Sequence, residues 1–127
     1  MSSAVTEGIR VEVVSAYLAD HSSEQERRWA FSYTVTITND GRVPVTLLAR
    51  HWVITDGHGH VEEVRGDGVV GHQPHLMSGQ SFTYTSGAVL RTAHGMMHGE
   101  YILQRDDGSR FDATIAPFGL VTPNSIN

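Results

Sequence analysis

The stretch Trp29-Ala-Phe-Ser-Tyr-Thr-Val-Thr-Ile-Thr38 alternates large apolar residues with small or hydroxylated ones. Successive side chains of a β-strand point to opposite faces of its sheet, so this stretch predicts one apolar and one hydroxylated face. Such a strand belongs in an antiparallel sheet that turns one face to a core and the other to water. The sequence Asn39-Asp40-Gly41 follows directly and predicts a turn.

The same alternation recurs on both sides of this stretch. Before it, Ile9, Val11 and Val13 alternate with polar residues, and residues 1–7 are expected to form a flexible N-terminal arm. After it, turn sequences at 56–59 and 106–109 predict two hairpins. Further strands are expected around 82–86, 97–103 and 111–115, the last ended by Pro117.

These features predict an all-β protein. About seven antiparallel strands without an amphipathic helix are typical of an immunoglobulin or fibronectin type III-like β-sandwich. The expected domain covers residues 8–123, and residues 124–127 are expected to form a tail. The absence of cysteine excludes a disulfide-stapled antibody domain, a thiolate metal site and a cysteine nucleophile.

The charge of the chain limits the classes of partner that it is expected to bind. All nine basic residues are arginine, fourteen residues are acidic, and the formal net charge is −5. An acidic chain without a basic run is not expected to bind nucleic acid. No apolar run approaches the roughly 20 residues that span a bilayer, so no membrane insertion and a cytoplasmic location are expected.

A glycine-rich segment, Gly66-Asp67-Gly68-Val69-Val70-Gly71, matches G-x-G-x-x-G. No helix pattern follows it, so a dinucleotide-binding fold is not expected. Two interpretations stay open: a strand connection whose glycines adopt positive φ, or a nest of backbone N–H groups for pyrophosphate or another small anion. Arg65, Gly66, Gly68 and Gly71 would form that anion site, with Arg50 as a further partner.

A second candidate is the triplet Arg50-His51-Trp52. Arginine and aromatic residues are enriched where proteins bind one another, and alternation places Arg50 and Trp52 on one face of a strand. The alternative is that Trp52 belongs to the core and Arg50 covers it.

The histidines offer a weaker metal hypothesis. Close pairs occur at 58 and 60, at 72 and 75, and at 94 and 98, without the further ligands of a zinc site. Weak divalent-metal binding is therefore a second alternative, and no dedicated metal site or cofactor is expected. No nucleophile–base motif or paired carboxylate occurs either, which predicts that the chain is not an enzyme.

Several segments occur in the order found in one known family: Leu48–Asp56, Val64–Pro74 and Phe82–Gly87, followed by Gly95–Tyr101 and Ile115–Phe118. From about Val11 to Pro123 the chain resembles the ApaG family. The resemblance implies a fibronectin type III-like sandwich in a bacterial protein associated with cobalt resistance and magnesium efflux. It also implies an interaction module, and a pyrophosphate motif that falls on Gly66, Gly68 and Gly71.

The leading hypothesis from the sequence is therefore a non-enzymatic module that binds an unknown protein partner. Exposed sheet edges would also permit self-association, so both a monomer and a dimer remain open.

Overall fold

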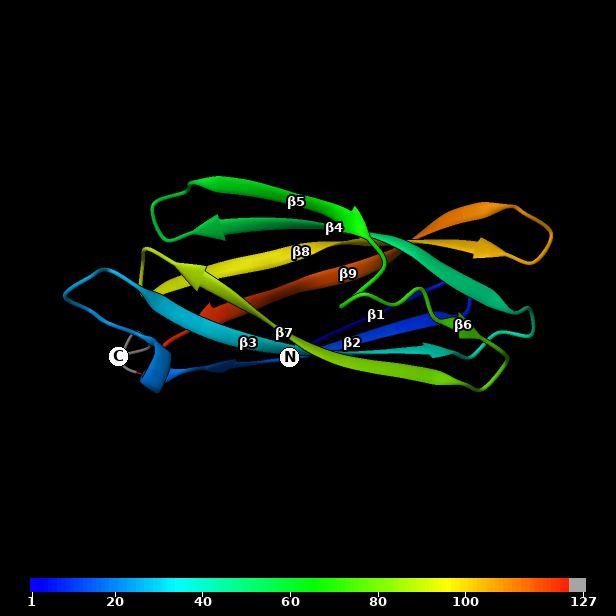
Figure 1. Ribbon diagram of the computed structural model, residues 1–127, viewed down its shortest axis with the longest axis horizontal. Helices are drawn as coiled ribbons and strands as arrows, with labels where there is room; N and C mark the ends of the chain where they lie inside the picture. Colours follow the sequence, from blue (N-terminus) through cyan, green and yellow to red (C-terminus); the bar gives the residue numbers. More distant parts are fainter. Residues whose placement is uncertain (124–127) are drawn as a thin grey trace.

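The computed structural model describes residues 1–123 and shows two packed antiparallel sheets (Figure 1). The predicted tail, residues 124–127, lies outside this range. One sheet has the order β1-β2-β3-β7 and the other the order β5-β4-β8-β9, with β6 also paired to β4. The elements are β1 (Ser2–Thr6), β2 (Ile9–Tyr17), the 3-10 turn η1 (Ala19–His21), β3 (Trp29–Asn39), β4 (Val45–Asp56), β5 (Val61–Asp67), β6 (His75–Leu76), β7 (Ser81–Leu90), β8 (His94–Arg105) and β9 (Arg110–Val121).

Strand β3 has the two faces that its sequence predicts. It pairs with β2 on one side and β7 on the other. Phe31, Val35 and Ile37 are at most 1% exposed, because their side chains all point between the sheets. The hydroxyls of the opposite face form hydrogen bonds across to β7, in the pairs Thr34–Thr85, Thr36–Thr83 and Thr38–Ser81.

The all-β sandwich expected from the sequence is confirmed. Residues 1–123 contain nine strands where about seven are expected, because β1 and the two-residue β6 carry no clear apolar alternation. In place of the expected flexible arm, Ser2–Thr6 pair antiparallel with β2, so that Ser2 lies opposite Val13. A sheet edge supplies backbone hydrogen bonds to any extended segment, so this pairing needs no apolar pattern. No helix within 1–123 is long and apolar enough to cross a membrane.

A β-bulge in β4 decides which of its side chains enter the core. The pairing of β4 with β8 shifts between Leu47 and Ala49. Because side chains alternate along a strand, one extra residue reverses the faces that follow it. Arg50 and Trp52 therefore point between the sheets, and His51 points outward.

The expectation that Pro117 ends the last strand is wrong, since β9 continues to Val121. The pairing of β8 with β9 shifts where Met97 and Gly99 face Phe118 and Ile115, so Pro117 lies in a bulge. Proline is tolerated at a bulge of an edge strand because no partner needs its missing N–H.

The two long sides of the sandwich differ. On one side the sheets are joined, because the Ser15 hydroxyl donates to the Gly119 carbonyl at 2.8 Å and the Thr114 N–H donates to Thr6 Oγ1 at 3.1 Å. On the other side the terminal strands are β5 and β7, and no hydrogen bond joins them in the described part of the chain. Figure 1 looks onto this open side, with the fainter β1 at the back.

Candidate binding groove

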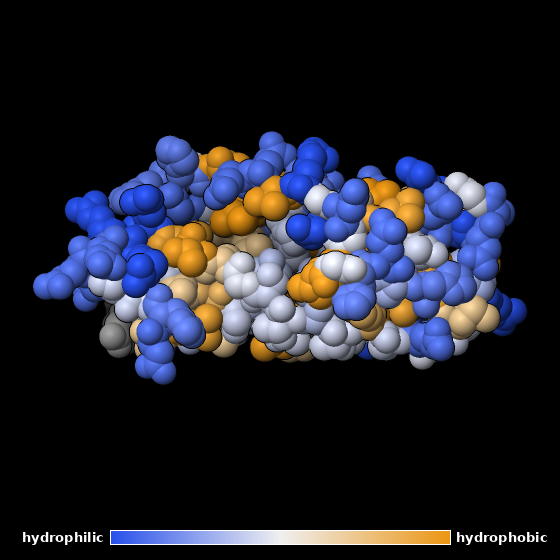
Figure 2. Space-filling view, viewed as in Figure 1, coloured by the Kyte–Doolittle hydropathy of each residue, from blue (hydrophilic) through white to orange (hydrophobic). Residues whose placement is uncertain are grey.

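A groove runs along the open side of the sandwich, between β5 and β7. Figure 2 shows patches of apolar side chains along the middle of this face, with hydrophilic side chains above them and mainly residues of intermediate hydropathy below. The groove consists of three adjoining hollows. An inner hollow of about 340 Å³ and a middle one of about 500 Å³ share Ile54, Glu62 and Val89. An outer hollow shares Arg27, His58 and Arg91 with the middle one. We name this whole surface the β5–β7 groove.

The groove exists because the inward face of β7 changes from large to small side chains. Tyr84 points inward and is 7% exposed, and alternation gives the next two inward positions to Ser86 and Ala88. These two short side chains line the inner hollow opposite Arg50 and Trp52 of β4. A large residue at either position would fill the space over Trp52.

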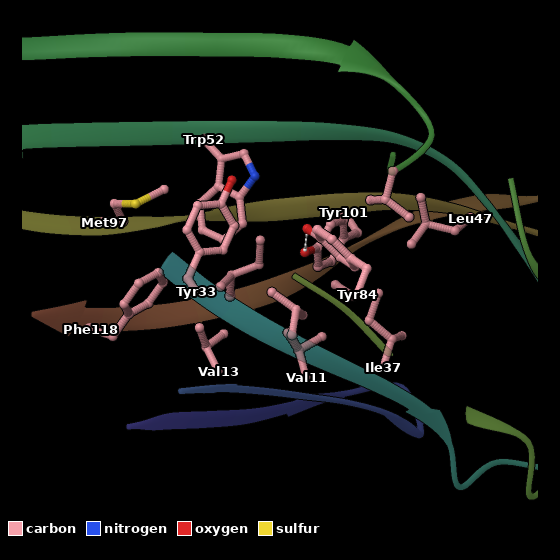
Figure 3. Close-up of a cluster of buried hydrophobic side chains, with 14 of the residues drawn as sticks. Val11, Val13, Tyr33, Ile37, Leu47, Trp52, Tyr84, Met97, Tyr101 and Phe118 are labelled. Carbon is pink, nitrogen blue, oxygen red and sulfur yellow. Dashed lines mark hydrogen bonds between the residues drawn. The ribbon is translucent and has the colours of Figure 1, made fainter. Parts of the chain in front are cut away.

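Trp52 lies at the base of the inner hollow, in an aromatic cluster (Figure 3). The Trp52 side chain is 2% exposed, and its ring centroid lies 5.1 Å from that of Tyr33 and 5.9 Å from that of Phe118. The indole Nε1 is buried and has no hydrogen-bond partner within residues 1–123. A buried donor without an acceptor costs roughly 1–3 kcal/mol, so this N–H marks a place for an additional acceptor.

Two tyrosine hydroxyls lie beside this indole. Tyr84 and Tyr101 hydrogen-bond to each other, and burial raises the pKa of both phenols far above the ordinary value. The Trp52 N–H opposes this rise in the pKa of Tyr84, although it does not reach hydrogen-bonding geometry. Both phenols therefore stay neutral, and the cluster contains no nucleophilic phenolate.

Arg50 holds the glycine segment against the groove. Its Nη1 donates to the carbonyl oxygens of Asp67 at 2.9 Å and Gly68 at 3.0 Å. The guanidinium lies so close to Gly66 that a Cβ there would come within 2.7 Å of Arg50 Cζ and Nη2. Gly66 thus allows Arg50 to lie flat on the backbone of β5. Within 1–123, Nε and Nη2 of Arg50 make no hydrogen bond and remain available as a planar pair of donors.

Two further arginines line the other end of the groove. Arg27 comes from the loop before β3, and Arg91 comes from the turn after β7. In the part of the chain that the structure describes, neither side chain has a hydrogen bond or an ion pair. Arg27 also has a φ of 51°, a left-handed conformation that is uncommon outside glycine.

The groove also contains carboxylates. Asp56 Oδ1 accepts the backbone N–H groups of His60 and His58, both at 2.9 Å, and these hydrogen bonds hold the pKa of Asp56 below its ordinary value. Glu62 lines the inner and middle hollows, and Glu24 lines the outer one. Each of the three hollows is therefore lined by both arginine and carboxylate side chains.

The glycine segment has structural reasons for its composition. Gly68 has a φ of 59°, and a Cβ there would lie 2.3 Å from the carbonyl oxygen of His72. The N–H of Gly68 donates to Leu48 O, and that of Val69 donates to His72 O. Two amides of the expected anion nest are therefore already in use. Gly71 also has positive φ, at 82°, in open space.

Arg65 does not join Arg50 in an anion site. Arg50 lies opposite Gly66 in the pairing of β4 with β5, so the neighbouring Arg65 side chain points to the other face. There it is exposed, with Nη2 3.9 Å from Glu63 Oε1. Anion binding by the glycine segment stays a prediction, and Arg65 and Arg50 cannot serve it together.

His51 also departs from its neighbours in the triplet Arg50-His51-Trp52. Its Nδ1 lies 2.6 Å from Glu100 Oε1 and its Nε2 lies 2.8 Å from Glu63 Oε1, on the outer face of the sheet. The hydrogen bond to Glu100, and then that to Glu63, raises the pKa of His51. Arg50 and Trp52 share one face, as expected, while His51 forms a separate ionic cluster.

The paired histidines do not converge with other ligands. Within residues 1–123, no group of three or more His, Cys, Asp or Glu side chains is arranged to hold a metal ion. His75 instead lies 3.0 Å from Asp106, and the ring of His72 lies 6.0 Å from that of Phe82. Metal binding by histidine pairs stays a prediction without geometric support.

Sequence reasoning missed Arg27 and Arg91, because no local pattern shows that two distant turns meet at one groove. The step from Phe82 and Tyr84 to Ser86 and Ala88 was a usable signal for the hollow.

Comparison with known proteins agrees with this architecture. The crystal structure of the ApaA protein from Bordetella pertussis superposes with a TM-score of 0.89 at 44% identity, covering 91% of this chain and 94% of that one. Protein ApaG of Anaeromyxobacter dehalogenans 2CP-1 is 57% identical over the full length of both chains. Protein ApaG of Pseudomonas syringae pv. tomato is 53% identical over 94% of each. The ApaG domain itself matches residues 19–105. This chain therefore belongs to the ApaG domain family.

Proposed function

We propose that this protein is a non-enzymatic binding module that engages a protein partner in the cytoplasm through the β5–β7 groove. The observation that carries the proposal is the edge strand β7, which forms one wall of the groove. It is ten residues long, SFTYTSGAVL, and contains no charge and no proline.

Edge strands normally carry features that prevent pairing with other chains, such as charges, proline, bulges or short length. In this protein β9 has a proline in a bulge, β5 carries several charges, and β1 has only five residues. Strand β7 has none of these features, and its pairing with β3 is regular. A long unprotected edge beside a groove suits the addition of a partner strand, whose backbone pairs with β7 and whose side chains enter the groove.

The role in cobalt resistance and magnesium efflux is part of the proposal and rests on the family resemblance. Since no metal-holding cluster occurs in residues 1–123, we assign this role to the partner complex and not to direct metal binding.

Site-specific photo-crosslinking in cells tests the proposal. A photoreactive phenylalanine analogue replaces Val89, which is 63% exposed at the groove rim, or Val14, which is 56% exposed on β2. We expect a discrete crosslinked protein from position 89 and none from position 14. Equal crosslinking at both positions, or none at position 89, would contradict a partner site on the groove.

A further inference from the structure

We propose that the β5–β7 groove selects an extended partner segment with two acidic residues separated by an apolar stretch. Arg50 binds one carboxylate, and Arg27 together with Arg91 binds the other. This inference rests on the proposed function and adds the chemistry by which the partner is recognised.

The first reason is the uneven pairing of arginines. Arg10, Arg28, Arg65 and Arg105 each form an ion pair with a carboxylate. The other five arginines form none within residues 1–123, although acidic residues outnumber basic ones by fourteen to nine. Two of the five, Arg42 and Arg110, lie outside the groove, and the other three are Arg27, Arg50 and Arg91. All three line the same groove. In an acidic protein, unpaired arginines that face one groove are the expected complement of an acidic ligand.

The second reason is the donor arrangement at the inner end. Arg50 Nη1 is held by two backbone carbonyls, which fixes the plane of the guanidinium and leaves Nε and Nη2 free. This fork matches the two oxygens of a carboxylate. Trp52, whose buried Nε1 lacks an acceptor, lines the same hollow. An acceptor that enters with the ligand, such as an ordered water, would complete its hydrogen bonding.

The spacing between the two ends sets the length of the segment. Arg50 and Asp56 lie six residues apart on β4, which corresponds to about 20 Å at roughly 3.3 Å per residue. Asp56 lines the same hollow as Arg27 and Arg91, so an extended segment of about seven residues reaches from Arg50 to these two arginines. Successive side chains of an extended segment point to opposite faces. Acidic residues at the first and seventh positions of the segment therefore point to the same wall of the groove.

The middle of the groove excludes a third acidic residue. Ile54, Val64 and Val89 supply apolar surface there, and Glu62 supplies a negative charge. An acidic side chain beside Glu62 would be repelled, whereas a branched apolar one would pack against Ile54 and Val64. Asp56 lies in the same hollow as Arg27 and Arg91, and these two positive charges offset its negative charge at the acidic end of the segment.

Selection from a random library of displayed twelve-residue peptides tests the inference with the full chain as bait. We expect wild-type protein to enrich peptides with two acidic residues about six positions apart around an apolar, β-forming stretch. The bait with Arg27→Gln and Arg91→Gln should lose the requirement for one of the two acids. Arg42→Gln is the matched control, since Arg42 is exposed, lies outside the groove and likewise forms no ion pair with any of the described residues.

A selected peptide then permits a double-mutant cycle by fluorescence anisotropy. We expect Arg27→Gln with Arg91→Gln to weaken binding about tenfold, and the matching Glu→Gln in the peptide to cause no further loss. The proposed requirement for two acidic residues is overturned if no peptide is selected, if the selected peptides lack acidic residues, or if Arg42→Gln weakens peptide binding equally. Crosslinking at position 89 that survives the paired substitution would overturn this inference while leaving the proposed function intact.

Discussion

His51 Nδ1 lies 2.6 Å from Glu100 Oε1, which ties β4 to β8 on the outer face of their sheet. The other ring nitrogen of His51 lies 2.8 Å from Glu63 on β5. One imidazole thus links three strands, including the edge strand that walls the groove. The hydrogen bonds to Glu100 and then Glu63 raise the pKa of His51, because both favour the charged ring, while burial opposes the rise.

We expect His51 to make the stability of the protein depend on pH. A raised folded-state pKa means that the stabilisation is fully present below the unfolded-state value near 6.5 and is lost as the pH rises through the folded-state value. Urea unfolding should therefore give wild type a higher free energy of unfolding than His51→Gln at pH 6. This difference between the two proteins should be about 1 kcal/mol smaller at pH 9. A difference for His51→Gln that is constant from pH 6 to pH 9 would refute the ionic link.

The buried pair Tyr84 and Tyr101 should be strongly coupled. Changing either residue to Phe leaves the other hydroxyl buried without its partner, at a cost of roughly 1–3 kcal/mol in the free energy of unfolding. The double variant removes both hydroxyls and should be more stable than the sum of the single effects predicts. Urea unfolding of the four proteins provides the cycle, and strict additivity would show that the hydrogen bond contributes nothing.

The glycines of the G-x-G-x-x-G segment should differ in sensitivity. At Gly68 an alanine meets positive φ and a Cβ only 2.3 Å from the His72 carbonyl oxygen, whereas at Gly71 it meets positive φ in open space. Gly71→Ala should cost roughly 1–2 kcal/mol from backbone conformation alone. Gly68→Ala should cost clearly more, because the turn has to move. Equal thermal unfolding temperatures for the two variants would contradict a structural role for the close contact at Gly68.

Asn39 should tolerate no change of its amide. It is 1% exposed, and its Nδ2 donates to the carbonyl oxygens of Val43 at 2.9 Å and Leu76 at 3.0 Å. Asn39→Asp places a buried carboxylate against two carbonyl acceptors, so we expect a loss of about 3 kcal/mol or more. Asp40→Asn, which alters only an exposed ion pair with Arg10, is the matched control and should unfold almost as wild type. Similar denaturation midpoints for both variants would contradict this role.

The fold class and most of the core follow from local patterns in the sequence. Burial along β3 repeats every two residues, so Phe31, Val35 and Ile37 can be assigned to the core without knowing their partners. Turn residues such as those at 106–109 are equally local, because glycine and aspartate set the backbone there. Strand β1 could not be predicted in this way, since its pairing depends on the available edge of β2 and not on the sequence pattern of β1 itself.

The set of side chains that share the groove depends instead on the tertiary structure. The bulge after Leu47 turns Arg50 inward and His51 outward, and a shift of one residue would have exchanged them. Arg27 and Arg91 meet because two turns, distant in the chain, close the same end of the sandwich. Such convergence depends on strand order and register between distant segments, which the period of a single strand does not contain.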